Sequence, residues 1–187
     1  DRKRTDLDTA TVATFYSISN CHAGLRGVSF GNFLIKQVVA ELQKLRPNLK
    51  TFVTLSPVPG FRKWVAQSLQ NGDALLSDTD KETLSELGEH DLPQDDFITQ
   101  LAARFLTQAK RASGTVADPV AHFHLGNGAT LLRIHPGADL SLRGTENSWG
   151  VIVNYLYDGE TIEQNHQAYA SDHDVSASPS VTALSKG

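Results

Sequence analysis

The fold of this chain is decided by Thr11-Val-Ala-Thr-Phe-Tyr-Ser-Ile-Ser19, Gly24-Leu-Arg-Gly-Val-Ser-Phe-Gly31 and Leu49-Lys-Thr-Phe-Val-Thr-Leu55. The first and third segments are rich in β-branched and aromatic residues and therefore predict strands. The second is a glycine-rich loop, and the apolar residues after it recur with helical spacing over residues 33–45 until Pro47 ends the helix. A strand, a helix and a second strand in this order predict two neighbouring parallel strands joined by a right-handed crossover.

The rest of the chain alternates between helical and extended patterns, with proline, glycine and asparagine marking the breaks. We expect helices over residues 59–71, 78–87, 97–108 and 119–127, extended segments over 140–142 and 151–157, and turn residues over 143–150. We interpret residues 73–95 as a polar, solvent-facing insertion. Residues 158–187, rich in Ser, Asp and Ala, predict a loosely ordered tail. The sequence therefore predicts one domain over residues 1–157.

Composition and charge narrow the function classes. The chain has 187 residues, 40% of them hydrophobic, which is enough for one domain with a core. Its formal charge is −4, so we expect neither nucleic acid nor an anionic membrane as a partner, and no apolar run has the length of a membrane helix. The single cysteine, Cys21, indicates a reducing compartment, and we expect the cytoplasm or, as the alternative, an organelle matrix. Because the sequence contains no methionine, we interpret it as an internal fragment of a longer chain.

The glycine-rich loop at residues 24–31 is the strongest physical indication of a ligand. Glycines let backbone amides approach a phosphate, and the N-terminus of the following helix adds partial positive charge. The loop lacks the Gly-Lys-Ser/Thr of a Walker motif and the spacing of a Rossmann fingerprint, so a mononucleotide diphosphate such as that of coenzyme A remains. Arg26 could clamp a phosphate with paired hydrogen bonds. The alternative for the loop is a tight turn that packs the helix onto the strand. The alternative for Arg26 is a turn residue exposed to solvent.

Ser56 follows the second predicted strand, at a position where parallel sheets commonly present groups that contact a ligand. It lacks the Gly-x-Ser-x-Gly motif of a hydrolase nucleophile. A hydrogen bond to a substrate carboxylate therefore fits the position better than covalent attack. A serine that caps a helix or stabilises a turn is the alternative.

Two of the seven histidines, His122 and His124, fall on the short helix that Asp118 and Pro119 are expected to begin. Side chains two positions apart on a helix point to different faces, which argues against both binding one metal ion. At most one of them therefore faces a site. Imidazole is the side chain best suited to proton transfer near neutral pH, but the residue pattern alone does not choose between the two.

Six short motifs together resemble the malonyl-CoA decarboxylase family. They follow one another in the family's order, and they are Phe15-Tyr-Ser-Ile-Ser19, Gly24-Leu-Arg-Gly-Val28, Gly31-Asn-Phe-Leu-Ile-Lys36, Leu55-Ser-Pro-Val-Pro-Gly-Phe61, Phe123-His-Leu-Gly-Asn-Gly-Ala129 and Ser141-Leu-Arg-Gly144. The resemblance is collinear from about Phe15 to Tyr157. It implies an α/β fold of the GCN5-related N-acyltransferase type, in which a mixed sheet is flanked by helices and here lacks its first strands.

The same resemblance assigns roles to individual residues. The family's catalytic serine falls on Ser56, and its catalytic histidine falls on His124 rather than on His122. The diphosphate of coenzyme A is expected to rest on the loop formed by Arg26, Gly27, Val28, Ser29, Phe30, Gly31 and Asn32.

The reaction implied by the resemblance is that of a lyase of fatty acid metabolism. Malonyl-CoA loses its free carboxylate as CO₂ and leaves the enolate of acetyl-CoA, which is then protonated at carbon. No metal or redox cofactor is implied, because coenzyme A is part of the substrate. The full-length parent is expected to be a homo-oligomer.

Two other functions stay open at this point. An acyl-CoA-dependent N-acyltransferase of the same fold would use the same phosphate loop, but it would need an amine-binding cleft and a base. A non-catalytic fragment that only binds coenzyme A is the other alternative. Release of CO₂ and acetyl-CoA without any amine would distinguish a decarboxylase from both.

Overall fold

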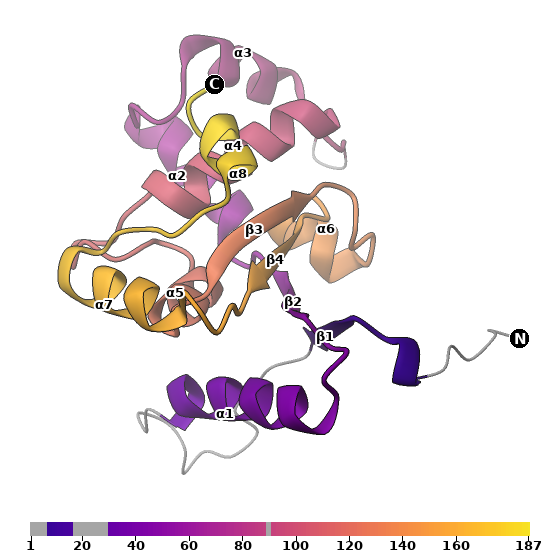
Figure 1. The fold of residues 1–187 in the computed structure, drawn as a ribbon. Coiled ribbons are helices and arrows are strands. Elements are labelled where there is room, and N and C mark those ends of the chain that lie inside the picture. Colours follow the sequence, from indigo (N-terminus) through magenta and orange to yellow (C-terminus); the bar gives the residue numbers. More distant parts are fainter. Residues whose placement is uncertain (1–6, 17–29, 89–90) are drawn as a thin grey trace, which may run out of the picture. The chain divides into compact units, whose positions relative to one another are not determined.

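The structure, a computed structural model, describes residues 7–16, 30–88 and 91–187 (Figure 1). These residues divide into two units. Unit 1 draws its described residues from Asp1–Ser56, Phe123–Leu131 and Asn154–Ser176, and unit 2 from Pro57–His122, Leu132–Val153 and Ala177–Gly187. Both units combine segments that are distant in the sequence, and the single domain expected over residues 1–157 stays a prediction. Of the helices among the described residues, none is long and apolar enough to cross a membrane.

Among the described residues, four strands form one sheet in the order β1-β2-β4-β3. They are β1 (Val12–Tyr16), β2 (Thr51–Pro57), β3 (Thr130–His135) and β4 (Ile152–Leu156). β1 and β2 run parallel, with Val12 opposite Thr51 and Tyr16 opposite Leu55, and α1 (Phe30–Leu45) lies between them in the sequence. The predicted pair of parallel strands with an intervening helix is therefore confirmed.

Unit 1 has buried apolar residues on its strands and on its helices. The helices that contribute to it are η1 (Leu7–Thr9), α1, the last residues of α5 (Pro119–Gly126) and α7 (Ile162–Asp172). α1 buries Ile35 and Val39, which lie one above the other on the same helix face. β2 buries Phe52, and α7 buries Tyr169. These buried side chains belong to the same unit as Ser56 of β2.

Unit 2 is mainly helical. Its helices, besides the first residues of α5, are α2 (Phe61–Asn71), α3 (Asp78–Glu86), α4 (Asp95–Gln108), α6 (Leu142–Ser148) and α8 (Pro179–Leu184). An aromatic cluster of Phe61, Trp64, Phe105 and Trp149 joins α2, α4 and the end of α6, with neighbouring ring centroids 5.0 to 6.3 Å apart. The expected helices at α2 and α4 are confirmed, except that Pro59 precedes α2 instead of lying in its first turn.

The C-terminal segment does not form the loosely ordered tail that we expected over residues 158–187. It forms α7 and α8, and these helices bury Tyr169 in unit 1 and Val181 in unit 2. Ser178 caps α8 by accepting a hydrogen bond from the backbone N–H of Val181. A short helix needs only one buried face, so a few apolar residues fold a segment whose composition is polar.

The segment from residue 140 to residue 150 also differs from the prediction. α6 replaces the extended segment expected over 140–142 and the turn residues expected over 143–150. Ser141 caps this helix by accepting a hydrogen bond from Gly144 N, and Trp149 ends it with a left-handed backbone at φ 51°. A helix of 7 residues is too short for its apolar spacing to be recognised.

The polar stretch at residues 73–95 contains the helix we expected, α3, but it is not uniformly solvent-facing. Leu76 and Leu84 are buried, and so is the carboxylate of Asp80. Arg104 of α4 pairs with Asp80 through two hydrogen bonds of 2.7 and 2.9 Å. The charged pattern is misleading because a sequence does not show which of its charges are paired in the interior.

The glycine-rich loop is only partly covered by the structure. α1 begins at Phe30, so Phe30, Gly31 and Asn32 belong to its first turn. They do not belong to a loop, as we expected for the phosphate-binding residues 26–32. The other expected phosphate-binding residues, Arg26, Gly27, Val28 and Ser29, lie outside the described residues, as do Cys21 and the last part of the first predicted strand.

Candidate active site

Ser56 and His124 are 68 residues apart in the sequence and meet in unit 1. Ser56 lies in β2 and His124 on α5, and Ser56 Oγ is 3.0 Å from His124 Nε2. Both side chains are buried, with exposed fractions of 4% and 2%. The two residues that we expected to act together are therefore in hydrogen-bonding contact, while their catalytic roles stay a prediction.

The start of α5 follows from its sequence. Asp118 Oδ1 accepts hydrogen bonds from the backbone N–H groups of Val120 and Ala121 at 2.9 and 2.8 Å, and Pro119 occupies the first helical position. The expected start of this helix is confirmed. Burial raises the pKa of the Asp118 carboxyl, although the backbone N–H groups that it accepts from act in the opposite direction. Of the two histidines on the helix, His124 is fully buried and His122 is not.

Two tyrosines complete the surroundings of the imidazole. The Tyr157 hydroxyl oxygen is 2.8 Å from His124 Nδ1, so each ring nitrogen of His124 contacts one hydroxyl group. The ring of Tyr155 stacks on the imidazole, with centroids 4.4 Å apart and an interplanar angle of 22°. Our reading of the sequence missed both tyrosines. Their spacing could have indicated them, because they are two positions apart in the segment predicted to be extended over 151–157, and such residues lie on one face of a strand.

The Ser56 hydroxyl has a second partner besides the imidazole. It donates a hydrogen bond of 2.9 Å to Thr54 Oγ1, which lies two residues earlier on β2. Thr54, Ser56, His124 and Tyr157 thus form one buried series of hydrogen-bonded side chains in unit 1. Such a series can hold a proton at a defined atom because water does not compete for the same groups.

Burial determines the charge of these groups. Removal from water lowers the pKa of His124 to about 3, so the imidazole is neutral near pH 7 and carries one N–H. The same effect raises the pKa of Tyr157 above its ordinary value, so the phenol keeps its proton. The site therefore holds an uncharged imidazole between two protonated hydroxyl groups.

The neutral imidazole should make stability depend on pH. In the unfolded chain the histidine pKa returns to about 6.5, so below that pH the unfolded state binds a proton that the folded state does not. The stability contribution of the neutral His124 is complete above pH 6.5. It should decline by about 1.4 kcal/mol per pH unit as the pH falls toward the pKa of His124 in the folded protein.

Urea denaturation of the protein and of His124→Gln between pH 7.5 and 4.5 measures this effect. The difference in free energy of unfolding between the two proteins should shrink as the pH falls, because only the protein with His124 loses this contribution. A difference that stays constant over the range would show that His124 is not buried as a neutral base.

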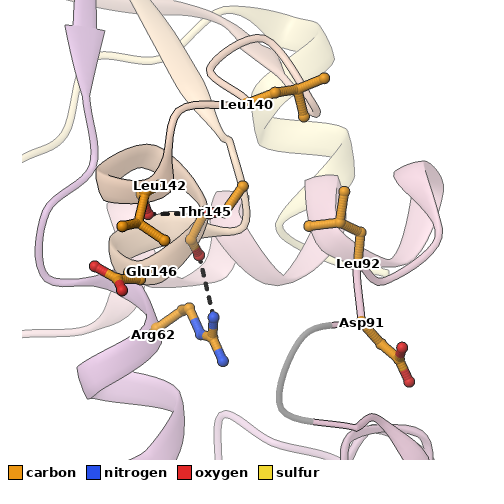
Figure 2. Close-up of a pocket in the computed structure, with 7 residues that line it drawn as sticks. All are labelled: Arg62, Asp91, Leu92, Leu140, Leu142, Thr145 and Glu146. Carbon is orange, nitrogen blue, oxygen red and sulfur yellow. Dashed lines mark hydrogen bonds between the residues drawn. The ribbon is translucent and has the colours of Figure 1, made fainter.

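Unit 2 contains a cavity that is separate from Ser56 and His124. It has a volume of about 600 Å³, and Figure 2 shows the residues that line it: Arg62, Asp91, Leu92, Leu140, Leu142, Thr145 and Glu146. Arg62 is already engaged, because it donates a hydrogen bond of 3.1 Å to the carbonyl oxygen of Thr145 and lies 4.7 Å from the centre of the Trp149 ring. Neither Ser56 nor His124 lines this cavity, so the candidate active site does not rest on it.

Comparison with known proteins points to one family. The family model for the malonyl-CoA decarboxylase C-terminal domain matches residues 1–187. The mitochondrial malonyl-CoA decarboxylase of Anser anser anser is 36% identical over 205 residues, which cover 96% of this chain and 41% of that protein. The mitochondrial malonyl-CoA decarboxylase of Mus musculus is 36% identical over 198 residues, which cover 92% of this chain and 40% of that protein. The chain thus spans about two fifths of the length of these curated relatives.

Solved structures agree with the sequence relatives. The crystal structure of malonyl-CoA decarboxylase from Rhodopseudomonas palustris matches with a TM-score of 0.87 and 44% identity, over 98% of this chain and 45% of that one. The corresponding protein from Agrobacterium vitis matches with a TM-score of 0.89 and 47% identity, over 98% of this chain and 47% of that one. These likenesses confirm the expected α/β fold, in which helices flank a sheet.

Proposed function

This chain belongs to the malonyl-CoA decarboxylase family, and we propose that it supplies the catalytic serine and histidine with which the whole protein converts malonyl-CoA to acetyl-CoA and CO₂. The observation that carries the proposal is the 3.0 Å contact between Ser56 and His124 inside unit 1. The activity is proposed for the whole protein because the chain spans only part of its relatives.

The first step is the loss of the carboxylate. The bond between the carboxylate carbon and the α-carbon breaks, CO₂ leaves, and the electron pair is shared by the α-carbon and the thioester oxygen as an enolate. In this proposal the Ser56 hydroxyl donates a hydrogen bond to the carboxylate and so orients the bond that breaks. A buried site favours this step because a carboxylate removed from water loses its charge when it departs as neutral CO₂.

The second step is protonation of the enolate at carbon. With its pKa near 3, His124 acts as a neutral imidazole, and a neutral imidazole can serve as a proton donor to a strongly basic enolate. As the ring gives up one proton, the Tyr157 hydroxyl on Nδ1 supplies another, so that no imidazolate forms. The tyrosinate left behind regains its proton from solvent before the next turnover. We expect no metal or redox cofactor, because the thioester of the substrate itself accepts the electron pair of the broken bond.

We infer that the diphosphate of coenzyme A binds at the junction of the glycine-rich loop and α1. The start of α1 at Phe30 supports this position, because the N-terminus of a helix carries partial positive charge. The residues proposed for this contact are Arg26, Gly27, Val28, Ser29, Phe30, Gly31 and Asn32.

The setting of the reaction is also part of the proposal. We infer a lyase of fatty acid metabolism that acts as a homo-oligomer, without nucleic acid as a partner, in the cytoplasm or in an organelle matrix. The names of the goose and mouse relatives, both described as mitochondrial, favour the matrix.

Product analysis tests the proposed function. The purified whole protein, incubated with malonyl-CoA and no amine, should release CO₂ and acetyl-CoA in equal amounts. Turnover that requires an added amine would instead identify an acyl-CoA-dependent N-acyltransferase. Binding of coenzyme A without release of CO₂ would identify a binding module, and either result would overturn the proposal.

A further inference from the structure

Thr54 is a buried residue whose hydroxyl contacts Ser56 in the candidate site. Its side chain has no exposed surface, and it lies on the same face of β2 as Ser56 because the two residues are two positions apart. Thr54 Oγ1 accepts a hydrogen bond from the Ser56 hydroxyl at 2.9 Å and another from the backbone N–H of Tyr155 at 3.2 Å. A hydroxyl oxygen accepts two hydrogen bonds, so both of its acceptor positions are occupied.

The sheet holds this hydroxyl in place. Between β2 and the end of β4, the backbone N–H of Tyr157 donates to the carbonyl oxygen of Phe52 at 2.8 Å. Two residues along, side chains add to the contacts between the strands: Tyr155 N donates to Thr54 Oγ1, and Asn154 Nδ2 donates to the Thr54 carbonyl oxygen at 2.6 Å. Thr54 Oγ1 is therefore anchored to the neighbouring strand and cannot turn away from Ser56.

We propose that Thr54 is a positioning residue that determines which ring nitrogen of His124 carries the proton, and the catalytic part of this inference rests on the proposed function. The Ser56 hydroxyl donates its hydrogen bond to Thr54 Oγ1, so the Ser56 oxygen is left to accept a hydrogen bond from His124 Nε2–H. Nδ1 then has no proton and accepts from the Tyr157 hydroxyl. Every hydrogen bond in the series thus runs in one direction, from Tyr157 to Thr54.

This direction matters for the reaction. The proton on Nε2 lies next to Ser56, which is where the proposed carboxylate and α-carbon bind. When malonyl-CoA arrives, the Ser56 hydroxyl turns from Thr54 to the carboxylate, and the proton on His124 stays where it is. Without Thr54 Oγ1, the remaining acceptor for the Ser56 proton among these groups is Nε2, and the ring proton moves to Nδ1, on the side of Tyr157.

Thr54→Val removes the acceptor and keeps the shape of the side chain. We expect a loss of turnover number of about 10²-fold, as is typical when a proton donor is misplaced, with a change in KM within about threefold. Thr54→Ser keeps the oxygen and should recover most of the turnover. Thr51→Val, on the same strand, removes a hydroxyl that is outside this series and should leave turnover unchanged.

Nitrogen NMR of the protein labelled with [¹⁵N]histidine reads the tautomer directly, without substrate. The His124 signals are identified by their loss in His124→Gln. We expect a protonated Nε2 in the wild type, in Thr54→Ser and in Thr51→Val, and a protonated Nδ1 in Thr54→Val.

Each other result overturns the inference. A wild-type protein with its proton on Nδ1 does so without any variant, even if Thr54→Val fails to fold. A folded Thr54→Val with the wild-type tautomer does so as well, and a changed tautomer with unchanged turnover removes the positioning role. If malonyl-CoA is not the substrate, the NMR result is unaffected, so failure of the proposed function and failure of this inference are distinguishable.

Discussion

Replacing His124 with alanine is expected to lower the turnover number for malonyl-CoA by about 10²- to 10⁴-fold, the range that a positioned proton donor contributes. The enolate must still be protonated at carbon, and without the imidazole the proton has to come from water in a site that is almost closed to it. KM should change less, because the proposed contacts with the diphosphate do not involve His124. Release of CO₂ at saturating malonyl-CoA measures the effect, and circular dichroism verifies that the variant folds.

His122→Ala is the matched control, because His122 lies on the same helix and is not buried with the candidate site. Its turnover should equal that of the unmodified protein. The turnover number of the unmodified protein should also show no titration near pH 6.5, since His124 stays neutral there. A folded His124→Ala protein with unchanged turnover would remove His124 from the mechanism.

The sequence was sufficient for the part of the fold that depends on local patterns. β1, α1 and β2 were predicted because β-branched residues, helical spacing and Pro47 act over a few neighbouring residues. The contact between Ser56 and His124 was expected from a family resemblance. The residue pattern alone left His122 and His124 equivalent, and burial in the folded chain distinguishes them.

The features that the sequence did not reveal depend on tertiary contacts. α7 and α8 have polar compositions, and their few apolar residues gain a partner only when the chain has folded. Tyr157 and Thr54 are far apart in the sequence, and neither belongs to a motif with a known spacing. Thr54 meets Ser56 because the two residues lie two positions apart on β2, and Tyr157 meets His124 of α5 only when the chain has folded.

Replacing Asp80 with alanine should lower the free energy of unfolding by about 3 to 5 kcal/mol, the cost of leaving a buried charge unpaired. Arg104 Nη1 and Nη2 donate to the two carboxylate oxygens of Asp80, and both side chains are almost fully buried. The Ser77 backbone N–H and hydroxyl also donate to this carboxylate, each at 2.7 Å, so the variant also loses the carboxylate half of the capping box of α3. Urea denaturation at pH 7 measures the difference.

Burial alone would raise the pKa of Asp80, but the hydrogen bonds from Arg104 and Ser77 outweigh it and hold the pKa below its usual range. The carboxylate therefore contributes its full stabilisation at neutral pH and loses it only as the pH falls through that lowered pKa. Asp78→Ala is the matched control, since Asp78 lies on the same helix and pairs with Lys81 in solvent, so stability should change little.

The double variant Asp80→Leu, Arg104→Met separates the two possible causes of the loss. If the unpaired charge of Arg104 dominates, removing both charges together should restore most of the stability that Asp80→Ala loses, because two apolar side chains leave no buried charge behind. If the double variant is as unstable as Asp80→Ala, the lost hydrogen bonds from Ser77 to the carboxylate and the lost packing dominate instead. A single Asp80→Ala variant that is as stable as the unmodified protein would show that this pair does not join α3 to α4.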